Sequence, residues 1–264
     1  MRWVNLGVAA ATLAFLVWTV GTGPFLDGLR AVDAGALAAA SGLAVLTTVC
    51  CAWRWRIVAR GLGIDLRLRT AVASYYRSLF LNVTLPGGVV GDVHRGLVHG
   101  LRAVVWERSA GQVVQIVLTA AVLLVLPSPL GTTVPLIALA LLVAGAVLAW
   151  RSELLARRAW PAVGLASALV VAGHAVTFLI AAHTAGATAP PSEMLPLALL
   201  VLLGAALPNI GGWGPREGVT AWAFAAAGLG ASLGVATAVV YGVMVFVANL
   251  PGAVVLAAGG VRRA

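Results

Sequence analysis

Long apolar stretches dominate this chain and set its predicted elements. Six of them have the roughly 17 to 25 residues that a helix needs to cross about 30 Å of hydrocarbon. They cover residues 3–20, 34–53, 109–127, 133–150, 160–183 and 233–258. The pattern therefore predicts an all-α polytopic membrane protein with six transmembrane helices, in a single membrane domain over residues 1–264.

Two shorter apolar stretches end in clusters of proline and glycine. Residues 70–85 lead into LPGGVVGDVHRG at 85–96, and residues 193–207 lead into LPNIGGWGPREG at 207–218. Backbone breaks at membrane depth are tolerated where protein or a watery cavity covers the freed polar groups. We therefore expect both breaks to face the protein interior. The residues assigned to the breaks are Pro86, Gly87, Gly88, Gly91, Pro208, Gly211, Gly212, Gly214, Pro215 and Gly218.

The two clusters lie about half a chain apart and predict an inverted repeat, with residues 1–130 as the first half and residues 131–264 as the second. In secondary transporters such repeats bring broken helices together near the bilayer midplane. The predicted re-entrant hairpins are 70–85 with 92–101, and 193–207 with 216–231. The second pair could instead form two short full spans, which gives eight transmembrane helices. We favour the hairpins.

Composition and charge fit this membrane assignment. Hydrophobic residues make up 61% of the chain and charged residues 9%, whereas soluble proteins are about a quarter charged. Every basic residue is Arg, and most of them, including Arg54 and Arg108, are assigned to short loops between spans. Because cytoplasmic loops are enriched in Lys and Arg, both termini are predicted to be cytoplasmic, at the cell membrane. The net charge of +9 then needs no nucleic acid as a partner.

The two clusters resemble the paired signatures of the lysylphosphatidylglycerol synthase transmembrane region, a flippase-like family. In the first cluster, Gly91 and Asp92 are followed by Arg95, three positions after the acid. The second cluster approaches the pattern Gly-x-x-Arg-Glu-Gly with Gly212 or Gly214, Arg216, Glu217 and Gly218. Larger members of the family also carry an aminoacyl-transferase domain. Since this chain ends at VRRA after its last span, the resemblance implies the stand-alone, lipid-handling part.

Four charged side chains in the clusters form the candidate substrate site: Asp92, Arg95, Arg216 and Glu217. Each costs at least about 2.5 to 3.5 kcal/mol at bilayer depth, so each should be paired or touch a ligand. Guanidinium groups suit phosphate, and helix N-termini bind anions. We expect Asp92 to be the N-cap of one return helix and Pro215 the first residue of the other. An anionic lipid head group fits such a site.

Several pairings of these charges are possible. Asp92 could pair with Arg216 and Arg95 with Glu217, which would form a latch between the halves. The adjacent Arg216 and Glu217 are not expected to face each other on one helix. Asp92 and Arg95, at i,i+3 spacing, could also satisfy each other locally. Alternatively, the two arginines bind the head group while the acids open or close the site.

Three further polar side chains are candidates for the same cavity. Arg77 lies along the first hairpin arm and either projects inward or extends to the cytoplasmic surface. His99 continues a basic stripe from Arg95 to Arg102 at i,i+4,i+7 spacing, which is a head-group track or an interfacial face. His174 lies mid-span, where an interhelical hydrogen bond is the first expectation and proton coupling the alternative.

The sequence favours a flippase-like transporter of an anionic or polyprenyl-phosphate-linked lipid. A non-transporting scaffold or accessory subunit of envelope lipid or glycan assembly is the alternative, and it predicts a dry, well-packed centre with all four charges paired. An ion-coupled carrier of a small anion predicts an aqueous cavity. No HExxH, GxSxG or GxxxxGK[ST] motif and no His/Cys cluster occurs, so we expect no enzyme activity, metal or cofactor. The identity of the lipid, the direction of transport, the energy source and the oligomeric state have no signal in the sequence.

Overall fold

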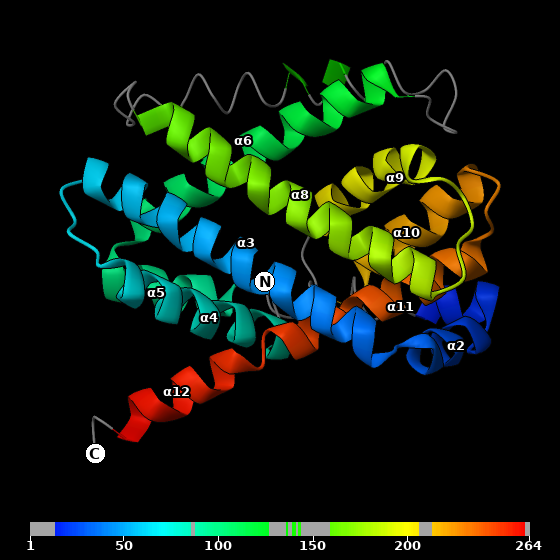
Figure 1. Ribbon diagram of the computed structural model, residues 1–264, viewed down its shortest axis with the longest axis horizontal. Coiled ribbons are helices and arrows are strands. Elements are labelled where there is room, and N and C mark those ends of the chain that lie inside the picture. Colours follow the sequence, from blue (N-terminus) through cyan, green and yellow to red (C-terminus); the bar gives the residue numbers. More distant parts are fainter. Residues whose placement is uncertain are drawn as a thin grey trace.

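The computed structural model describes residues 14–85, 88–126, 136, 139–140, 142–143, 159–205 and 213–261. Within these residues its elements are ten helices (Figure 1). They are α2 (Gly23–Ala31), α3 (Ala34–Gly61), α4 (Leu68–Thr84), α5 (Val90–His99), α6 (Leu101–Val125), α8 (Trp160–Thr184), α9 (Pro191–Gly204), α10 (Pro215–Ala226), α11 (Ala231–Ala248) and α12 (Pro251–Val261). The described elements are thus all helical, as the sequence predicts.

Four apolar helical segments are long enough to span a membrane within the described part of the chain. They are Ala34–Gly61, Leu101–Val125, Trp160–Thr184 and Ala231–Ala258, and they match four of the six predicted spans. Most of the predicted spans at 133–150 and 3–20 lies outside the described residues. The protein is therefore a membrane protein of apolar helices. The number of crossings, six or eight, stays a prediction.

Two of the spans are longer than the hydropathy pattern predicts. Helix α3 continues to Gly61 rather than ending at 53, and α6 begins at Leu101 rather than at 109. Both extensions carry charged residues that the sequence assigned to cytoplasmic loops. Arg54 and Arg108 therefore lie on helices, which corrects their loop assignment.

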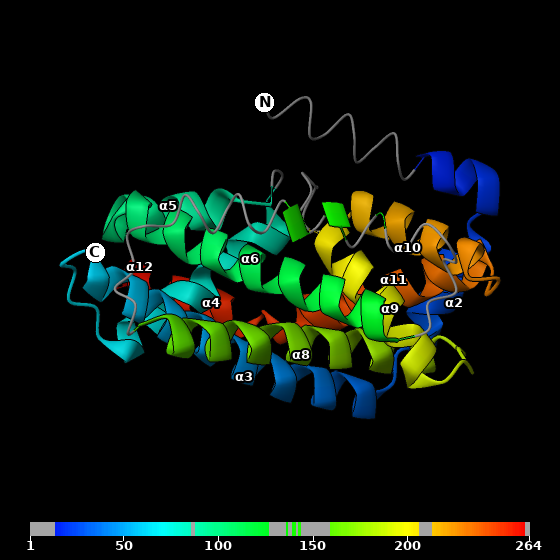
Figure 2. The same ribbon diagram turned by 90° about the horizontal axis from the view of Figure 1, so that it is seen from above.

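Helices α3 and α8 run side by side along the long axis of the molecule (Figures 1 and 2), and α6 packs on both. The pair α4 and α5 lies toward one end of the long axis, and the pair α9 and α10 toward the other. Helix α11 contacts α3, α8 and α10, so it joins the second pair to the central helices. The two short helix pairs thus flank a common set of long helices.

Both Pro/Gly clusters separate two short helices that pack on each other, while the re-entrant path and the inverted repeat stay predictions. Helix α4 ends at Thr84 before α5 begins at Val90, and α9 ends at Gly204 before α10 begins at Pro215. Pro215 is the first residue of α10, because its fixed φ and missing N–H are tolerated there. Gly88 and Gly214 have positive φ values of 65° and 113°, which favour glycine.

Five of the predicted break residues lie outside the described residues: Pro86, Gly87, Pro208, Gly211 and Gly212. Three others, Gly91, Pro215 and Gly218, lie within the first turns of α5 and α10. Gly91 is buried, and a Cβ there would overlap the backbone of Ser78 on α4. This glycine therefore allows the close approach of the two arms.

The last apolar stretch is interrupted between α11 and α12. Helix α11 ends at Ala248, and α12 starts at Pro251, where proline cannot donate to the preceding helical turn. The side chain of Asn249 donates to the carbonyl oxygen of Val245 at 2.8 Å. Gly252 then lies against the backbone of Tyr76, so α12 contacts α4.

Candidate functional site

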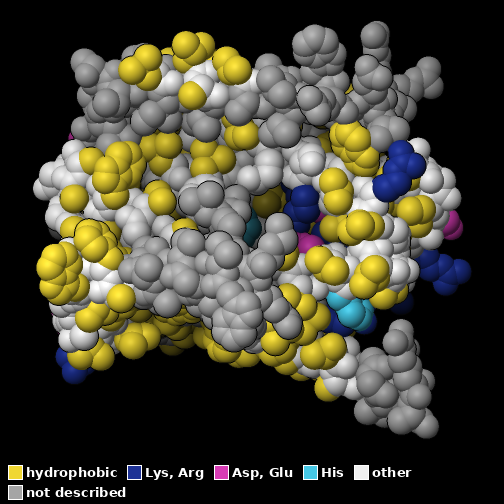
Figure 3. Space-filling model, turned by 180° about the vertical axis from the view of Figure 1, so that it is seen from behind, with side chains coloured by type: hydrophobic (Ala, Val, Ile, Leu, Met, Phe, Trp, Pro, Cys, Tyr) yellow, Lys and Arg dark blue, Asp and Glu magenta, His cyan; other side chains and the backbone are white. Residues whose placement is uncertain are grey.

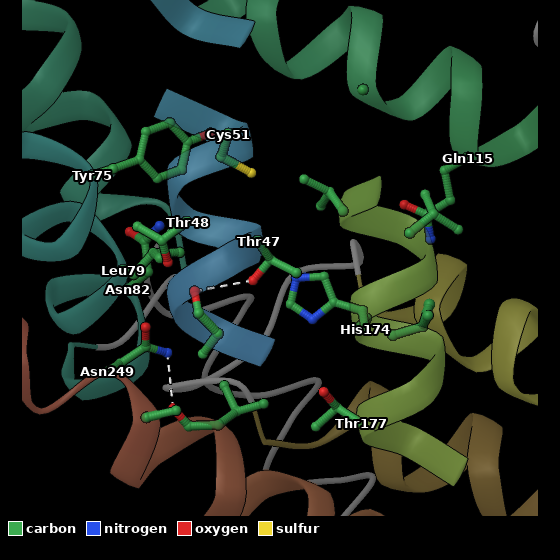
Figure 4. Close-up of a pocket in the computed structure, with 18 of the residues that line it drawn as sticks. Thr47, Thr48, Cys51, Tyr75, Leu79, Asn82, Gln115, His174, Thr177 and Asn249 are labelled. Atoms are coloured by element: carbon green, nitrogen blue, oxygen red, sulfur yellow. Dashed lines mark hydrogen bonds between the residues drawn. The ribbon is translucent and has the colours of Figure 1, made fainter. Parts of the chain in front are cut away.

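A cavity of about 310 Å³ lies among α3, α4, α6, α8, α9 and α11. Its described lining includes the uncharged polar residues Thr47, Thr48, Asn82, Gln112, Gln115, Ser167, His174, Thr177 and Asn249. Figure 4 shows Thr47 of α3 and His174 of α8 pointing into the space between their helices. On the face drawn in Figure 3, the surface is hollowed near its middle, and basic, acidic and histidine side chains show there among apolar ones.

Both broken segments reach this cavity. Asn82 and Val83, near the end of α4, line it from one side, and Leu202 and Ala205, at the end of α9, line it from the other. Helices that lead into the two Pro/Gly clusters therefore end at a shared space. The expectation that the breaks themselves face the protein interior concerns mostly residues 86–87 and 206–212, which lie outside the described residues, and it stays a prediction.

Two arginines line the cavity, and both come from the helix extensions. They are Arg54 of α3 and Arg108 of α6. The side chain of Arg54 is 5% exposed, whereas that of Arg108 is 42% exposed. No Asp or Glu is among the described residues that line this space. The charged groups on the cavity wall are thus cationic.

Glu107 is the centre of a buried ion network behind this wall. Its carboxylate is fully buried and accepts hydrogen bonds from Arg54, from Nη2 of Arg95 at 3.0 Å and from Oη of Tyr75 at 2.8 Å. Arg54 also donates to Oγ of Ser167 at 3.0 Å. Five helices are joined through these contacts, since the five residues lie on α3, α4, α5, α6 and α8. Buried charges persist when they are paired in this way.

Asp92 forms the second part of the network. Its carboxylate accepts hydrogen bonds from Nη2 of Arg95 at 3.0 Å, Nη2 of Arg108 at 2.6 Å, Oγ of Ser78 at 3.1 Å and Nδ2 of Asn82 at 3.0 Å. Arg95 thereby bridges Asp92 and Glu107. We expected each motif charge to be paired or to touch a ligand. Asp92 and Arg95 meet this expectation because they are paired within the protein.

Asp92 is not the N-cap of α5, which corrects the sequence prediction. The cap position is held by Val89, and Asp92 is the third helical residue. Its carboxylate turns toward α4 and α6 instead, because two guanidinium groups there are stronger partners than a helical N–H. The N–H of Gly91 donates to Oδ1 of Asn82 at 2.7 Å, so α4 supplies the local acceptor.

The second cluster contains a separate buried ion pair. Glu217 accepts from Nε of Arg216 at 3.0 Å and from the N–H of Gly214 at 2.6 Å. Both side chains are buried. The prediction that these neighbours do not pair is wrong, because Glu217 folds back over the first turn of α10 and the long Arg216 side chain reaches it there.

The predicted latch between the halves does not form among the described residues. Asp92 pairs with Arg95 and Arg108, while Arg216 pairs with Glu217. Each cluster neutralises its acid with a nearby arginine, so no cross-half partner is required. The local i,i+3 pairing of Asp92 and Arg95 is the arrangement that the structure contains.

Arg95 and Arg216 lie behind tyrosine rings that line the cavity. The guanidinium carbon of Arg95 is 4.0 Å from the ring centre of Tyr75, and that of Arg216 is 5.4 Å from the ring centre of Tyr241. Both tyrosines line the cavity, whereas neither of these arginines does. Cations stack favourably on aromatic faces at such distances. The motif arginines thus support the cavity wall rather than form its surface.

The remaining predicted site residues lie away from the cavity surface. Arg77, on α4, and His99, at the end of α5, are both half-buried and are not among the lining residues. Nε2 of His99 is 3.1 Å from Oγ of Ser74, and its ring meets Trp55 edge-on. The predicted basic stripe is wrong, because the helix breaks at Gly100, with φ of 102°, and Arg102 belongs to α6.

His174 makes the interhelical contact that the sequence predicts. Its Nδ1 lies 3.2 Å from Oη of Tyr241, which joins α8 to α11. Both side chains line the cavity. The hydrogen-bonding prediction is confirmed, and proton coupling stays a prediction.

Comparison with known proteins gives one family. The family model described as the lysylphosphatidylglycerol synthase TM region matches residues 2–252. No curated protein matches the chain. The matched range includes both Pro/Gly clusters, the cavity and the buried ion network.

Proposed function

The chain belongs to the family of the lysylphosphatidylglycerol synthase transmembrane region, and from this premise we propose that it is a flippase-like transporter. It is a membrane protein of lipid-related envelope function. In the proposal, it moves a lipid with an anionic head group between the leaflets of the cell membrane, with both termini cytoplasmic. The lipid undergoes no chemical reaction.

The observation that carries the proposal is the cationic cavity between the long helices. Its described lining holds Arg54 and Arg108 without a carboxylate, together with many uncharged polar side chains. A phosphate would gain charge-assisted hydrogen bonds there. Polar and charged groups inside a membrane protein are costly and typically mark a substrate pathway. An anionic head group is the ligand that this lining fits best.

The similar construction of the two halves supports an alternating mechanism. In each half, a short helix ends at the cavity, a Pro/Gly cluster follows, and an arginine stacks on a cavity tyrosine. Inverted repeats that rock around a fixed central site are a common basis of transport. In our proposal the two halves alternately open the cavity toward each leaflet.

The scaffold function is favoured by a different observation. All four motif charges, Asp92, Arg95, Arg216 and Glu217, have partners within the protein, as a static scaffold requires. The same function predicts a dry and well-packed centre, which a polar cavity of about 310 Å³ does not fit. The cavity therefore favours transport.

Blocking the cavity tests the transport proposal. The protein is reconstituted into liposomes with a fluorescent phospholipid, and leaflet exchange is followed by quenching from outside. Val170 lines the cavity, so Val170→Trp should fill part of it and reduce exchange at least severalfold. The matched control is Leu169→Trp, because the neighbouring Leu169 is 39% exposed and is not a lining residue. Wild-type exchange no faster than that of protein-free liposomes, or equal rates for both variants, would contradict transport through the cavity.

A further inference from the structure

We propose that Arg108 binds the phosphate of the transported lipid, and that the ligand is a phosphodiester with one negative charge and a small uncharged head group. The inference rests on the proposed function and narrows its substrate class. Lipids with glycerol or a single sugar beyond the phosphodiester belong to this class. Arg108 is outside both Pro/Gly clusters, at the eighth residue of α6.

The accessibility of Arg108 distinguishes it from the other guanidinium groups of the network. Arg54 also lines the cavity, but its side chain is 5% exposed and donates to Glu107 and Ser167. Arg54 is also pressed against α6, where a Cβ on Gly111 would lie 2.6 Å from its Nη1. Arg95 is covered by aromatic rings and lines no part of the cavity. Arg108 is 42% exposed and can therefore turn toward a ligand.

Arg108 also has donors to spare. Its Nη2 donates to Asp92 at 2.6 Å, while its Nε is buried and has no hydrogen-bond partner among the described residues, so that this donor is accessible to a ligand only when the side chain turns. A guanidinium group carries five N–H donors in a planar fork that matches phosphate oxygens. Asp92 is in turn held by Arg95, Ser78 and Asn82. A ligand can thus share Arg108 without leaving the carboxylate unpaired.

The charge of the network sets the charge of the ligand. Among the described residues, Arg54, Arg95 and Arg108 face two carboxylates, those of Asp92 and Glu107, which leaves one positive charge without a carboxylate there. A phosphodiester carries one negative charge and neutralises this excess. A phosphomonoester carries about 1.5 to 2 negative charges near pH 7 and would leave uncompensated charge in a low-dielectric site.

The cavity disfavours cationic head groups. No carboxylate is among its described lining residues, and Asp92, the acid bonded to Arg108, already accepts from two guanidinium groups. An ammonium group, such as either of those in a lysyl ester, would lie near the positive charge of Arg108 and would find no free carboxylate among the described lining residues. Thr47, Gln112 and Gln115 line the same space and can bind hydroxyl groups of an uncharged head group. The volume of about 310 Å³ is at the lower end of the roughly 300–1,000 Å³ of ligand pockets, so the head group is small.

Lipid competition tests this assignment. Purified protein in nanodiscs of zwitterionic phosphatidylcholine is titrated with phosphatidylglycerol, its lysyl ester and phosphatidic acid, and binding is followed by tryptophan fluorescence. We expect phosphatidylglycerol to bind best, with an affinity at least about tenfold higher than the other two. Soluble glycerophosphoglycerol provides the same phosphodiester without acyl chains and should bind more weakly than the lipid. If glycerophosphoglycerol bound as tightly as phosphatidylglycerol, the ligand would be a soluble phosphodiester and not a lipid.

Substitution of Arg108 tests the residue itself. Arg108→Gln should weaken phosphatidylglycerol binding at least about tenfold, equivalent to about 1.4 kcal/mol, and remove the preference over phosphatidylcholine. The matched control Arg102→Gln removes the same charge from an exposed position on the same helix and should leave binding unchanged. Arg108→Lys retains the charge and should keep part of the preference, which separates a binding effect from misfolding.

The outcomes separate this inference from the proposed function. If wild-type protein exchanges lipid between leaflets but Arg108→Gln binds phosphatidylglycerol as well as wild type does, the assignment of Arg108 is wrong and transport stands. Preference for the lysyl ester or for phosphatidic acid would refute the proposed charge of the ligand. Without lipid exchange by wild-type protein, the proposed function fails as well.

Discussion

Replacing Glu107 by glutamine should destabilise the protein strongly. The substitution retains the shape of the side chain but removes its charge. Arg54 and Arg95, with side chains 5% and 1% exposed, would then lose their shared carboxylate in the interior. Arg95 would keep Asp92, whereas Arg54 would keep only Ser167 and its contact with Cys51 among its described partners.

The magnitude follows from the burial of these partners. Removing one member of a buried ion pair costs about 3–5 kcal/mol, because the remaining charge stays buried without compensation. Two ion pairs of Glu107 are lost, with Arg54 and with Arg95, but the loss in the free energy of unfolding is not doubled. The amide oxygen introduced by Glu107→Gln would still accept one hydrogen bond, and Asp92 still compensates the charge of Arg95. We therefore expect a loss of about 3–5 kcal/mol in the free energy of unfolding.

Unfolding in mixed micelles of dodecyl sulfate and a mild detergent measures this loss. Tryptophan fluorescence follows the unfolding, and one of the nine tryptophans, Trp55, lies at the network, with its ring centre 4.4 Å from the guanidinium carbon of Arg95. The control is Glu193→Gln, since Glu193 is exposed in the first turn of α9, and an exposed substitution should change the free energy by less than about 0.5 kcal/mol. If Glu107→Gln changed stability no more than this control, Glu107 would not be the charged centre of the network.

Two further changes test local features of the fold. Gly91→Ala should destabilise the protein by about 1–3 kcal/mol in the same unfolding assay, because the added methyl group would overlap the backbone of Ser78 on α4. The control is Gly42→Ala, in open space on α3, which should be neutral or stabilising by up to about 1 kcal/mol. Equal effects of the two substitutions would argue against close packing at Gly91. Tyr241→Phe removes the hydroxyl that joins α11 to His174 and should cost about 1 kcal/mol, whereas no loss of stability would indicate that this contact contributes nothing.

The positions of the long helices and of the two breaks could be predicted because their causes are local. Apolar stretches of sufficient length identify the spans, and proline fixes the start of α10 at Pro215. The close packing of α4 on α5 also has a local cause, because Gly91 has no Cβ to overlap the backbone of Ser78. Each of these features depends on residues near one another in the chain.

The network of Arg54, Glu107 and Arg108 could not be predicted from hydropathy, because a charged residue lowers the apolar average and ends the predicted span. Arg54 and Glu107 compensate each other across 53 positions of sequence, which no local window can detect. A signal did exist in the sequence. Residues 101–108 contain no proline or glycine, so nothing in them ends a helix before the apolar part of α6 begins.

The sequence predicts the motif arginines as head-group contacts, whereas in the structure they lie behind the cavity wall. Each buried motif arginine pairs with an acid of its own cluster and stacks on a tyrosine ring. Arg95 pairs with Asp92 and stacks on Tyr75, and Arg216 pairs with Glu217 and stacks on Tyr241. Once paired and stacked, they can affect the cavity through Tyr75 and Tyr241, whose rings form its wall. The excess positive charge of the buried ion network reaches the cavity surface at Arg108, which pairs with Asp92 and also lines the cavity. The motif residues thus support the cavity wall, while in our proposal Arg108, a residue outside both motifs, binds the ligand.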